Sequence, residues 1–245
     1  VYIELICSIL GSETFAYYWN DAAANAGEQA QFSDEVIEKI KLHKAGVLKD
    51  GTEWDTTNNN WRMYTTSFAN TNWFKQFYRK WAPAQEHNLS VRGGSEKMSY
   101  YFSAGWLNQE GLIRYNTDIF DRYSLNGKIS AQILPYLRLN YNSRFNRIDY
   151  VRSSYLTEGN GLFMHNIARR WPTVPVRDPN GNFVYGNEIA HLNNGQAKDQ
   201  NDALTQQVAL IFTPLKGWTT NVELNYKTEN NFTHKDWLPI YKYDK

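Results

Sequence analysis

Apolar and polar residues alternate strictly through the middle of the chain, in three runs between residues 86 and 146. From residue 98 the sequence reads MSYYFSAGW, from residue 123 it reads YSLNGKISAQI, and a third run begins at Leu137. Successive side chains of a β-strand point to opposite sides, so this period predicts strands with one apolar and one polar face. The apolar face of the third run has one polar exception, Ser143.

The length of these runs and their aromatic residues indicate what the apolar face contacts. A soluble β-sandwich would show the same alternation, with the apolar face turned toward a second sheet. Each run is about 10 residues long, however, which is the length that a tilted strand needs to cross a bilayer. Trp106, Tyr123 and Tyr141 lie near the ends of the apolar face, as in the aromatic girdles of outer-membrane barrels. The pattern favours a membrane barrel, and a sandwich is the alternative.

In a barrel, the apolar face would contact membrane lipid and the polar face would line a water-filled lumen. The residues predicted to face the lumen are Ser99, Tyr101, Asn126, Lys128, Arg138, Asn140, Asn142 and Arg144.

The lengths of the connections support a barrel. About seven candidate strands follow from the pattern, at residues 1–10, 86–94, 97–107, 121–133, 136–148, 203–213 and 217–230. The sixth has a polar exception on its apolar face, Gln206. Short turns alternate with long loops, which we place at residues 11–85, 108–120 and 151–202. Outer-membrane barrels have short periplasmic turns and longer outer loops. We therefore predict an all-β fold, an antiparallel transmembrane barrel segment with helical insertions in its long extracellular loops.

The insertion before residue 86 contains three stretches that are typical of helices. Residues 13–26 are rich in alanine and stop at Gly27, and residues 34–44 follow Ser33, a good N-cap. Residues 72–80 are aromatic and stop before a proline. Residues 50–72 are rich in Asn, Thr and Asp, and we expect a loop there.

Composition narrows the function classes. The chain is 42% hydrophobic with a mean hydropathy of −0.64, and it has no run approaching the ~20 apolar residues of a spanning helix. Its net charge of +1 lacks the strong positive charge that is typical of nucleic-acid-binding proteins. The single cysteine, Cys7, excludes an internal disulfide. Its surroundings faintly suggest a lipoprotein acylation site, and a plain buried strand cysteine is the favoured interpretation.

No arrangement of residues indicates catalysis. The five histidines lie in different elements without metal-ligand spacing, and no serine has a nearby base. The segment DPNGN from Asp178 faintly resembles a calcium loop, but Ile189 occupies the position where a bidentate glutamate is expected, so a turn is favoured. We predict no enzyme, no catalytic residue, no metal and no cofactor.

The long loop at 151–202 is the part predicted to touch a substrate or partner. Its candidate substrate-binding residues are Tyr155, Trp171, Phe183 and Tyr185. Aromatic faces and amides suit sugar rings, which carry apolar C–H patches surrounded by hydroxyls. The alternative is that these aromatics pack within the loop or against a lid protein.

The segment from Trp73 to Ile133 resembles SusC/RagA-type TonB-linked outer-membrane transporters of Bacteroidetes. Four elements carry the resemblance in order: the aromatic helix, the segment APAQEHNLSVRGGSEK from residue 82, the NQEG of residues 108–111, and the DRYS of residues 121–124. Residues 1–10 match nothing in the family pattern.

The resemblance implies a barrel of about 22 strands with an N-terminal plug. It also implies a SusD-like lipoprotein partner, energy from TonB through an N-terminal part, and import of oligosaccharides or sometimes peptides across the Gram-negative outer membrane. The chain lacks the plug, the TonB-contacting segment and a signal peptide, so we expect a fragment of one barrel domain. A secreted carbohydrate-binding β-sandwich and a barrel enzyme are the alternative functions.

Overall fold

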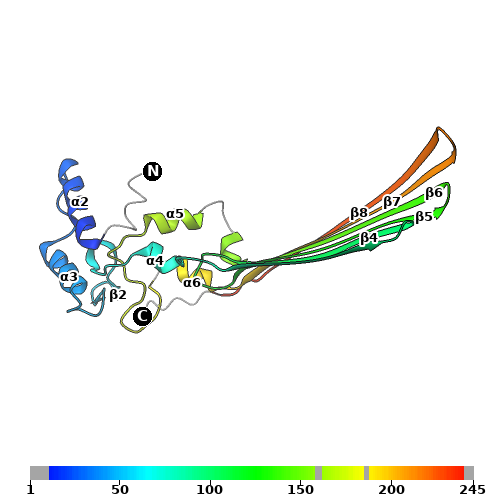
Figure 1. The fold of residues 1–245 in the computed structure, drawn as a ribbon. Helices are drawn as coiled ribbons and strands as arrows, with labels where there is room; N and C mark the ends of the chain where they lie inside the picture. Colours follow the sequence, from blue (N-terminus) through cyan, green and yellow to red (C-terminus); the bar gives the residue numbers. More distant parts are fainter. Residues whose placement is uncertain (1–10, 158–161, 185–187, 240–245) are drawn as a thin grey trace.

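The computed structural model of the protein describes residues 11–157, 162–184 and 188–239. It has two regions, a long, narrow sheet and a group of helices and loops at one end of it (Figure 1). We call the second part the loop region, which comprises residues 11–83, 111–117 and 154–195.

The sheet is a six-stranded antiparallel meander in which each strand pairs with its neighbour in sequence. Its strands are β3 (Ala84–Gly94), β4 (Met98–Glu110), β5 (Asp118–Leu134), β6 (Leu137–Ser153), β7 (Gln196–Leu215) and β8 (Trp218–Lys235). The six predicted strands after residue 85 are therefore present. The predicted strand at residues 1–10 lies outside the described residues.

The strands are longer than predicted at the end that joins the loop region. β7 begins at Gln196 rather than at 203, and β8 continues to Lys235 rather than ending at 230. The sequence QAKDQND at 196–202 has no apolar alternation, so it was predicted as loop. Its backbone nevertheless continues the hydrogen-bonded ladder with β6 and β8. The predicted loops 108–120 and 151–202 shrink accordingly, to 111–117 and 154–195.

Strand register places the apolar residues of neighbouring strands side by side. One row across the sheet consists of Tyr100, Ile129, Tyr141, Val208 and Leu224. The two polar exceptions of the sequence, Ser143 and Gln206, are direct cross-strand partners. They share a row with Gly127, and the Phe102 ring lies over this glycine, where a side chain would otherwise be. The exceptions therefore form one polar pair in an otherwise apolar face, in a row that also contains Phe102 and Tyr226.

Nothing in the described part of the chain covers the apolar face. Leu125 is 53% exposed and Leu224 is 70% exposed. Figure 1 shows the helices gathered beyond one end of the sheet, with no second layer against it. A sandwich would bury these side chains against another sheet, so the described residues lack the layer that the sandwich alternative requires.

The two main helices of the loop region follow their sequence signals. α3 (Asp34–Lys44) begins after Ser33, whose hydroxyl accepts a hydrogen bond from the Val36 backbone N–H. α2 (Ser12–Asn25) ends before Gly27, which adopts a positive φ while the Glu28 N–H bonds to the Ala23 carbonyl. This left-handed glycine closes the helix by satisfying its last carbonyls. Among the described residues, no helix combines the length and apolar character that crossing a bilayer requires.

The third predicted helix, at 72–80, is shorter than expected. α4 (Trp73–Phe77) is capped by the Asn72 side chain and stops before Tyr78. Tyr78 instead forms a bridge with Ile113, and the Arg79 N–H bonds to the Leu112 carbonyl. The helix ends there because these residues pair with the loop at 111–117.

Two buried clusters form the core of the loop region. One surrounds Trp73, Phe77 and Ile167, and the other surrounds Phe15, Phe32 and Ile40. The segments predicted as loops also contain the short elements β1 (Trp54–Asp55), β2 (Asn60–Trp61), η1 (Tyr64–Thr66), η2 (Ser154–Thr157), α5 (Leu162–Arg169) and α6 (Glu188–Leu192). The loop region is thus packed like a small globular protein.

Candidate functional site

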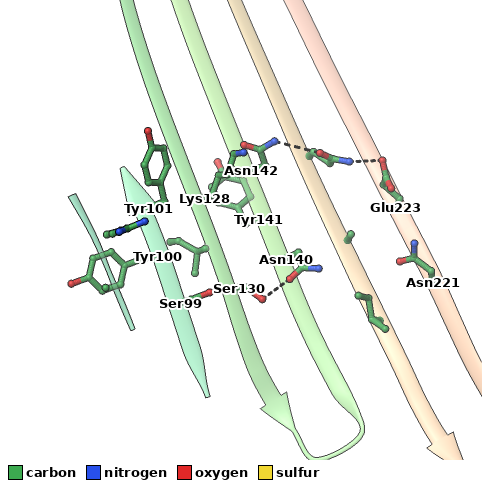
Figure 2. A pocket seen from close by; sticks show the side chains of 16 residues that line it. Ser99, Tyr100, Tyr101, Lys128, Ser130, Asn140, Tyr141, Asn142, Asn221 and Glu223 are labelled. Atoms are coloured by element: carbon green, nitrogen blue, oxygen red, sulfur yellow. Dashed lines mark hydrogen bonds between the residues drawn. The ribbon is translucent and has the colours of Figure 1, made fainter. Parts of the chain in front are cut away.

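The polar face of the sheet carries a hollow of about 950 Å³, shown close up in Figure 2. Five of the eight residues predicted to face a lumen line it, namely Ser99, Tyr101, Lys128, Asn140 and Asn142. Asn126, Arg138 and Arg144 share the same face by register but lie outside the hollow. The structure therefore brings all eight onto one side of the sheet and groups five of them.

A first set of hydrogen bonds crosses strands β4, β5 and β6 on this face. The Asn126 amide donates to the Ser103 hydroxyl over 3.2 Å, and Arg144 Nε donates to the Asn126 carbonyl oxygen over 3.2 Å. Four residues further along β5, Ser130 Oγ donates to Asn140 over 2.7 Å. These bonds fix the polar side chains across the strands, as cross-strand pairs do in other sheets.

A second set continues across strands β6, β7 and β8. The Asn142 amide donates to Gln207 over 3.5 Å, and Gln207 donates to Glu223 over 2.5 Å (Figure 2). The Asn225 amide also donates to Glu223, over 2.8 Å. Gln207 and Glu223 were not among the predicted lumen residues, although the two-residue period of their strands places them on this face. The result is a polar surface that presents both hydrogen-bond donors and acceptors.

The sequence elements that carry the family resemblance meet at the rim, where the sheet joins the loop region. Arg79 contacts Glu110 over 2.5 Å, which links the segment after α4 to the NQEG element. Asp121 of the DRYS element accepts hydrogen bonds from Asn108 over 2.9 Å and from the Trp106 indole over 3.1 Å. The motif spacing thus encodes side-chain contacts across adjacent strands.

A set of side-chain hydrogen bonds also joins the loop at 111–117 to the long loop at this rim. Asn116, which has a φ of 64°, donates from its side-chain amide to the carbonyls of Leu192 and Gly195, each over 2.8 Å. The Gln196 amide donates in turn to Asn116 Oδ1 over 3.1 Å. A single asparagine therefore ties the loop at 111–117 to the end of the long loop.

The predicted aromatic residues of the long loop that the structure describes pack inside the loop region. The Trp171 ring packs against four other rings, those of Phe15, Trp19, Phe32 and Tyr64, with centroids 4.3–5.9 Å away. Tyr155 contacts Phe163 and His191, Phe183 lies under the Arg177 guanidinium, and Tyr185 is outside the described residues. The three described candidates all pack against the buried cluster around Trp73 and Phe77.

The described residues contain no group of three or more His, Cys, Asp or Glu side chains that could hold a metal ion. The DPNGN segment forms a turn, in which Asp178 accepts from the backbone N–H groups of Gly181 and Asn182 and Gly181 has a φ of 86°. Cys7 lies outside the described residues.

Comparisons with known proteins give relatives of one kind. No protein-family profile matches the chain. It is 22% identical over 182 residues to a TonB-dependent receptor of Formosa agariphila, covering 69% of this chain and 17% of the relative. It is 28% identical over 78 residues to the TonB-dependent receptor SusC of Bacteroides thetaiotaomicron, covering 31% of this chain and 8% of the relative.

Solved structures show the same fold. The chain matches a structure of the RagAB peptide importer in a closed-closed state, with a TM-score of 0.63, 22% identity, and coverage of 98% of this chain and 28% of the other. A second RagAB peptide transporter structure matches with a TM-score of 0.60, 18% identity, and coverage of 94% and 26%. The chain spans less than a third of each of these proteins.

Proposed function

We propose that this chain, which is similar to part of the SusC/RagA-type TonB-dependent receptors, forms a section of barrel wall in an outer-membrane nutrient transporter. The observation that supports this most strongly is the contrast between the two faces of one sheet. The apolar face is uncovered, and the opposite face is polar and hydrogen-bonded across its strands. In water such an apolar surface would be a liability, whereas lipid covers it at no cost.

The outer face changes character toward the rim, as a membrane-crossing wall should. The row that contains Trp106 and Tyr123 continues into the Arg147–Asp202 pair, whose atoms approach to 2.6 Å, and Asp121 lies on the same face two residues closer to the rim. An apolar band bounded by aromatics and then by charges is the pattern of a bilayer interface. The loop region would therefore lie outside the cell.

The substrate and partners of the complete transporter are part of the proposal. We infer import of oligosaccharides or peptides with a SusD-like lipoprotein, powered by TonB through an N-terminal part. The relatives named above as receptors and as a peptide importer support this class of function. They also agree with the prediction that the protein is not an enzyme.

Labelling of neighbouring cysteines in whole cells tests the assignment of the two faces. In a Cys7→Ser background, Leu125→Cys and Asn126→Cys would be introduced separately into the complete receptor. We expect a charged, water-soluble thiol reagent to modify Asn126→Cys and to leave Leu125→Cys unmodified, because lipid excludes the reagent from the apolar face. Equal modification of both positions in folded receptor would contradict the proposal.

A further inference from the structure

Tyr64 is the most unusual residue of the loop region. Its φ is 58°, and the residue is 52% exposed. A bulky L-residue rarely adopts this conformation, because its side chain is sterically strained there. The other non-glycine residues with positive φ in the described part of the chain are Asn59 and Asn116, a residue type that tolerates it. The position favours glycine or asparagine, so the presence of an exposed aromatic ring there points to a role for the ring.

Buried hydrogen bonds hold the Tyr64 backbone in place. Its carbonyl accepts from Thr173 Oγ1 over 2.9 Å and from Ser67 Oγ over 3.2 Å, and both of these residues are fully buried. The edge of the ring contacts Trp171, with centroids 5.6 Å apart. One side of the ring is therefore anchored to the core of the loop region while the rest faces solvent.

A cavity of about 300 Å³ adjoins this ring. Its lining side chains are those of Tyr64, Asn166, Arg169, Arg170, Trp171, Val174 and Glu188. Arg170 and Glu188 form an ion pair in which the two side chains are only 9% and 10% exposed, with Arg170 Nε donating to Glu188 over 2.5 Å. The Arg170 guanidinium also lies 5.0 Å from the centre of the buried Trp73 ring. The back of the cavity is thus a fixed, charged wall.

We propose that this cavity binds a hydroxylated sugar ring of a saccharide ligand, an inference that rests on the transport function proposed above. The half-exposed Tyr64 ring offers a flat apolar surface for the C–H face of a sugar. Asn166 offers an amide that makes no hydrogen bond to the described residues, and Glu188 and Arg170 offer an acceptor and a donor for hydroxyls. A few placed polar groups beside an aromatic surface are typical of small-molecule sites.

The geometry favours a saccharide over a peptide. Extended peptides are commonly bound by adding a strand to an exposed sheet edge, and none of the lining residues belongs to a strand. The volume lies at the lower end of the range for ligand sites, which suits one sugar ring with part of its neighbour.

The left-handed backbone of Tyr64 allows a sharp test in the complete receptor. Tyr64→Asn removes the ring with a residue that tolerates positive φ, whereas Tyr64→Phe keeps the ring. Tyr18→Ala is the matched control, because it removes a tyrosine that is 62% exposed on α2, away from the cavity. Binding would be measured by saturation-transfer NMR and calorimetry with a neutral glucan tetrasaccharide, a uronic acid tetrasaccharide and tetra-alanine.

We expect at least one of the two tetrasaccharides to bind, and Tyr64→Asn to weaken that binding by about tenfold or more. Tyr64→Phe and Tyr18→Ala should bind as the unmodified receptor does, and Tyr64→Asn should melt at an unchanged or higher temperature. Equal affinity in Tyr64→Asn, binding of tetra-alanine alone, or binding of none of the three probes would each overturn the inference. Cysteine labelling of the sheet reports separately on the transporter proposal, so the two can fail independently.

Discussion

The loop region of this chain buries its apolar side chains, and the sheet leaves most of its own exposed. In the loop region Trp73, Phe77 and Ile40 are completely buried among other side chains. In the sheet, by contrast, large apolar residues such as Leu89 and Leu224 are at least 70% exposed, and Ala197 near the rim is the only apolar strand residue that is buried among those described. The loop region carries its own core, and the sheet requires a surrounding apolar medium.

This difference shows that a pattern of apolar residues has to be interpreted together with the medium, water or lipid, that surrounds the folded segment. The loop region follows the rule for proteins in water, in which apolar groups gather inside. The sheet pairs its strands through ladders of backbone hydrogen bonds and leaves its apolar face uncovered, and on the proposed function lipid would cover that face. On the same proposal, the rim where Asp121 and Asn116 make their contacts would be the boundary between water and lipid.

We expect the largest loss of stability when an aromatic side chain is removed from the core of the loop region. Trp73→Ala should destabilise the loop region by about 3–5 kcal/mol, because it leaves a large cavity and removes the indole hydrogen bond to the Trp171 carbonyl. Phe102→Ala on the apolar face should cost less than about 1 kcal/mol in a bilayer, because lipid fills the space. Thermal melting of the receptor in lipid measures both. Equal costs would show that the apolar face is packed against protein.

The next largest effect is expected from introducing a charged residue on the apolar face of β7, compared with the same substitution on its polar face. Val208 lies on the apolar face, and its neighbour Ala209 lies on the polar face and lines the hollow. Val208→Arg should destabilise the folded barrel by about 2–4 kcal/mol, whereas Ala209→Arg should be nearly neutral. The fraction of folded receptor in outer membranes, measured by heat-dependent gel migration, distinguishes them. The opposite order would reverse our assignment of the faces.

A smaller, local effect is expected at the rim. Asn116→Gly keeps the positive φ and removes the side chain that bonds to Leu192 and Gly195. We expect a loss of about 1–3 kcal/mol, because two carbonyls lose a donor. Hydrogen exchange should rise around residues 190–196 and stay unchanged in β4 and β5. Asn59→Gly, at another asparagine with positive φ, serves as the control and should change neither segment.

The smallest predicted effect is a pH dependence confined to the loop region. Burial lowers the pKa of His43 below its usual range, with Asp50 opposing this in part, and His43 Nδ1 is buried without a hydrogen-bond partner in the described structure. The unfolded chain therefore takes up a proton on this histidine more readily than the folded chain does. Its contribution to stability is complete above about pH 6.5 and declines as the pH falls below that value.

We expect this decline to stay under about 1 kcal/mol, because the ring is only partly buried and solvent screens its charge. Melting of the loop region at pH 7.5 and pH 5.5 measures it, and His43→Gln should reduce the difference between the two temperatures. An unchanged difference in His43→Gln would assign the pH dependence to other groups. The transition of the sheet should not respond to this substitution.

Much of the fold could be predicted from local sequence. The two-residue period identified the six described strands and the faces of residues such as Tyr100 and Asn126, since side-chain alternation is a property of each strand alone. The cap at Ser33 and the stop at Gly27 fixed the helix bounds for the same reason. The polar strand ends at 196–202 were missed because backbone pairing there depends on neighbouring strands.

The candidate site was predictable on the sheet and much less so in the loop region. Lys128 and Asn142 could be assigned to the polar face from their spacing. Trp171 was correctly placed in the long loop, but no local signal indicated its contacts with rings from α2 and η1. Tyr64 also escaped notice, because neither its positive φ nor its neighbouring cavity leaves a mark in the sequence.

Alternation and motif spacing were enough to predict the strands, their two faces and the resemblance to a family of transporters, because both act over a few residues. The folded structure was needed to show that the motifs meet at one rim, that Ser143 and Gln206 share a row, and that the long loops have a core of their own. These features depend on contacts between segments that are far apart in the chain. Such contacts are set by packing and register, which no single stretch of sequence contains.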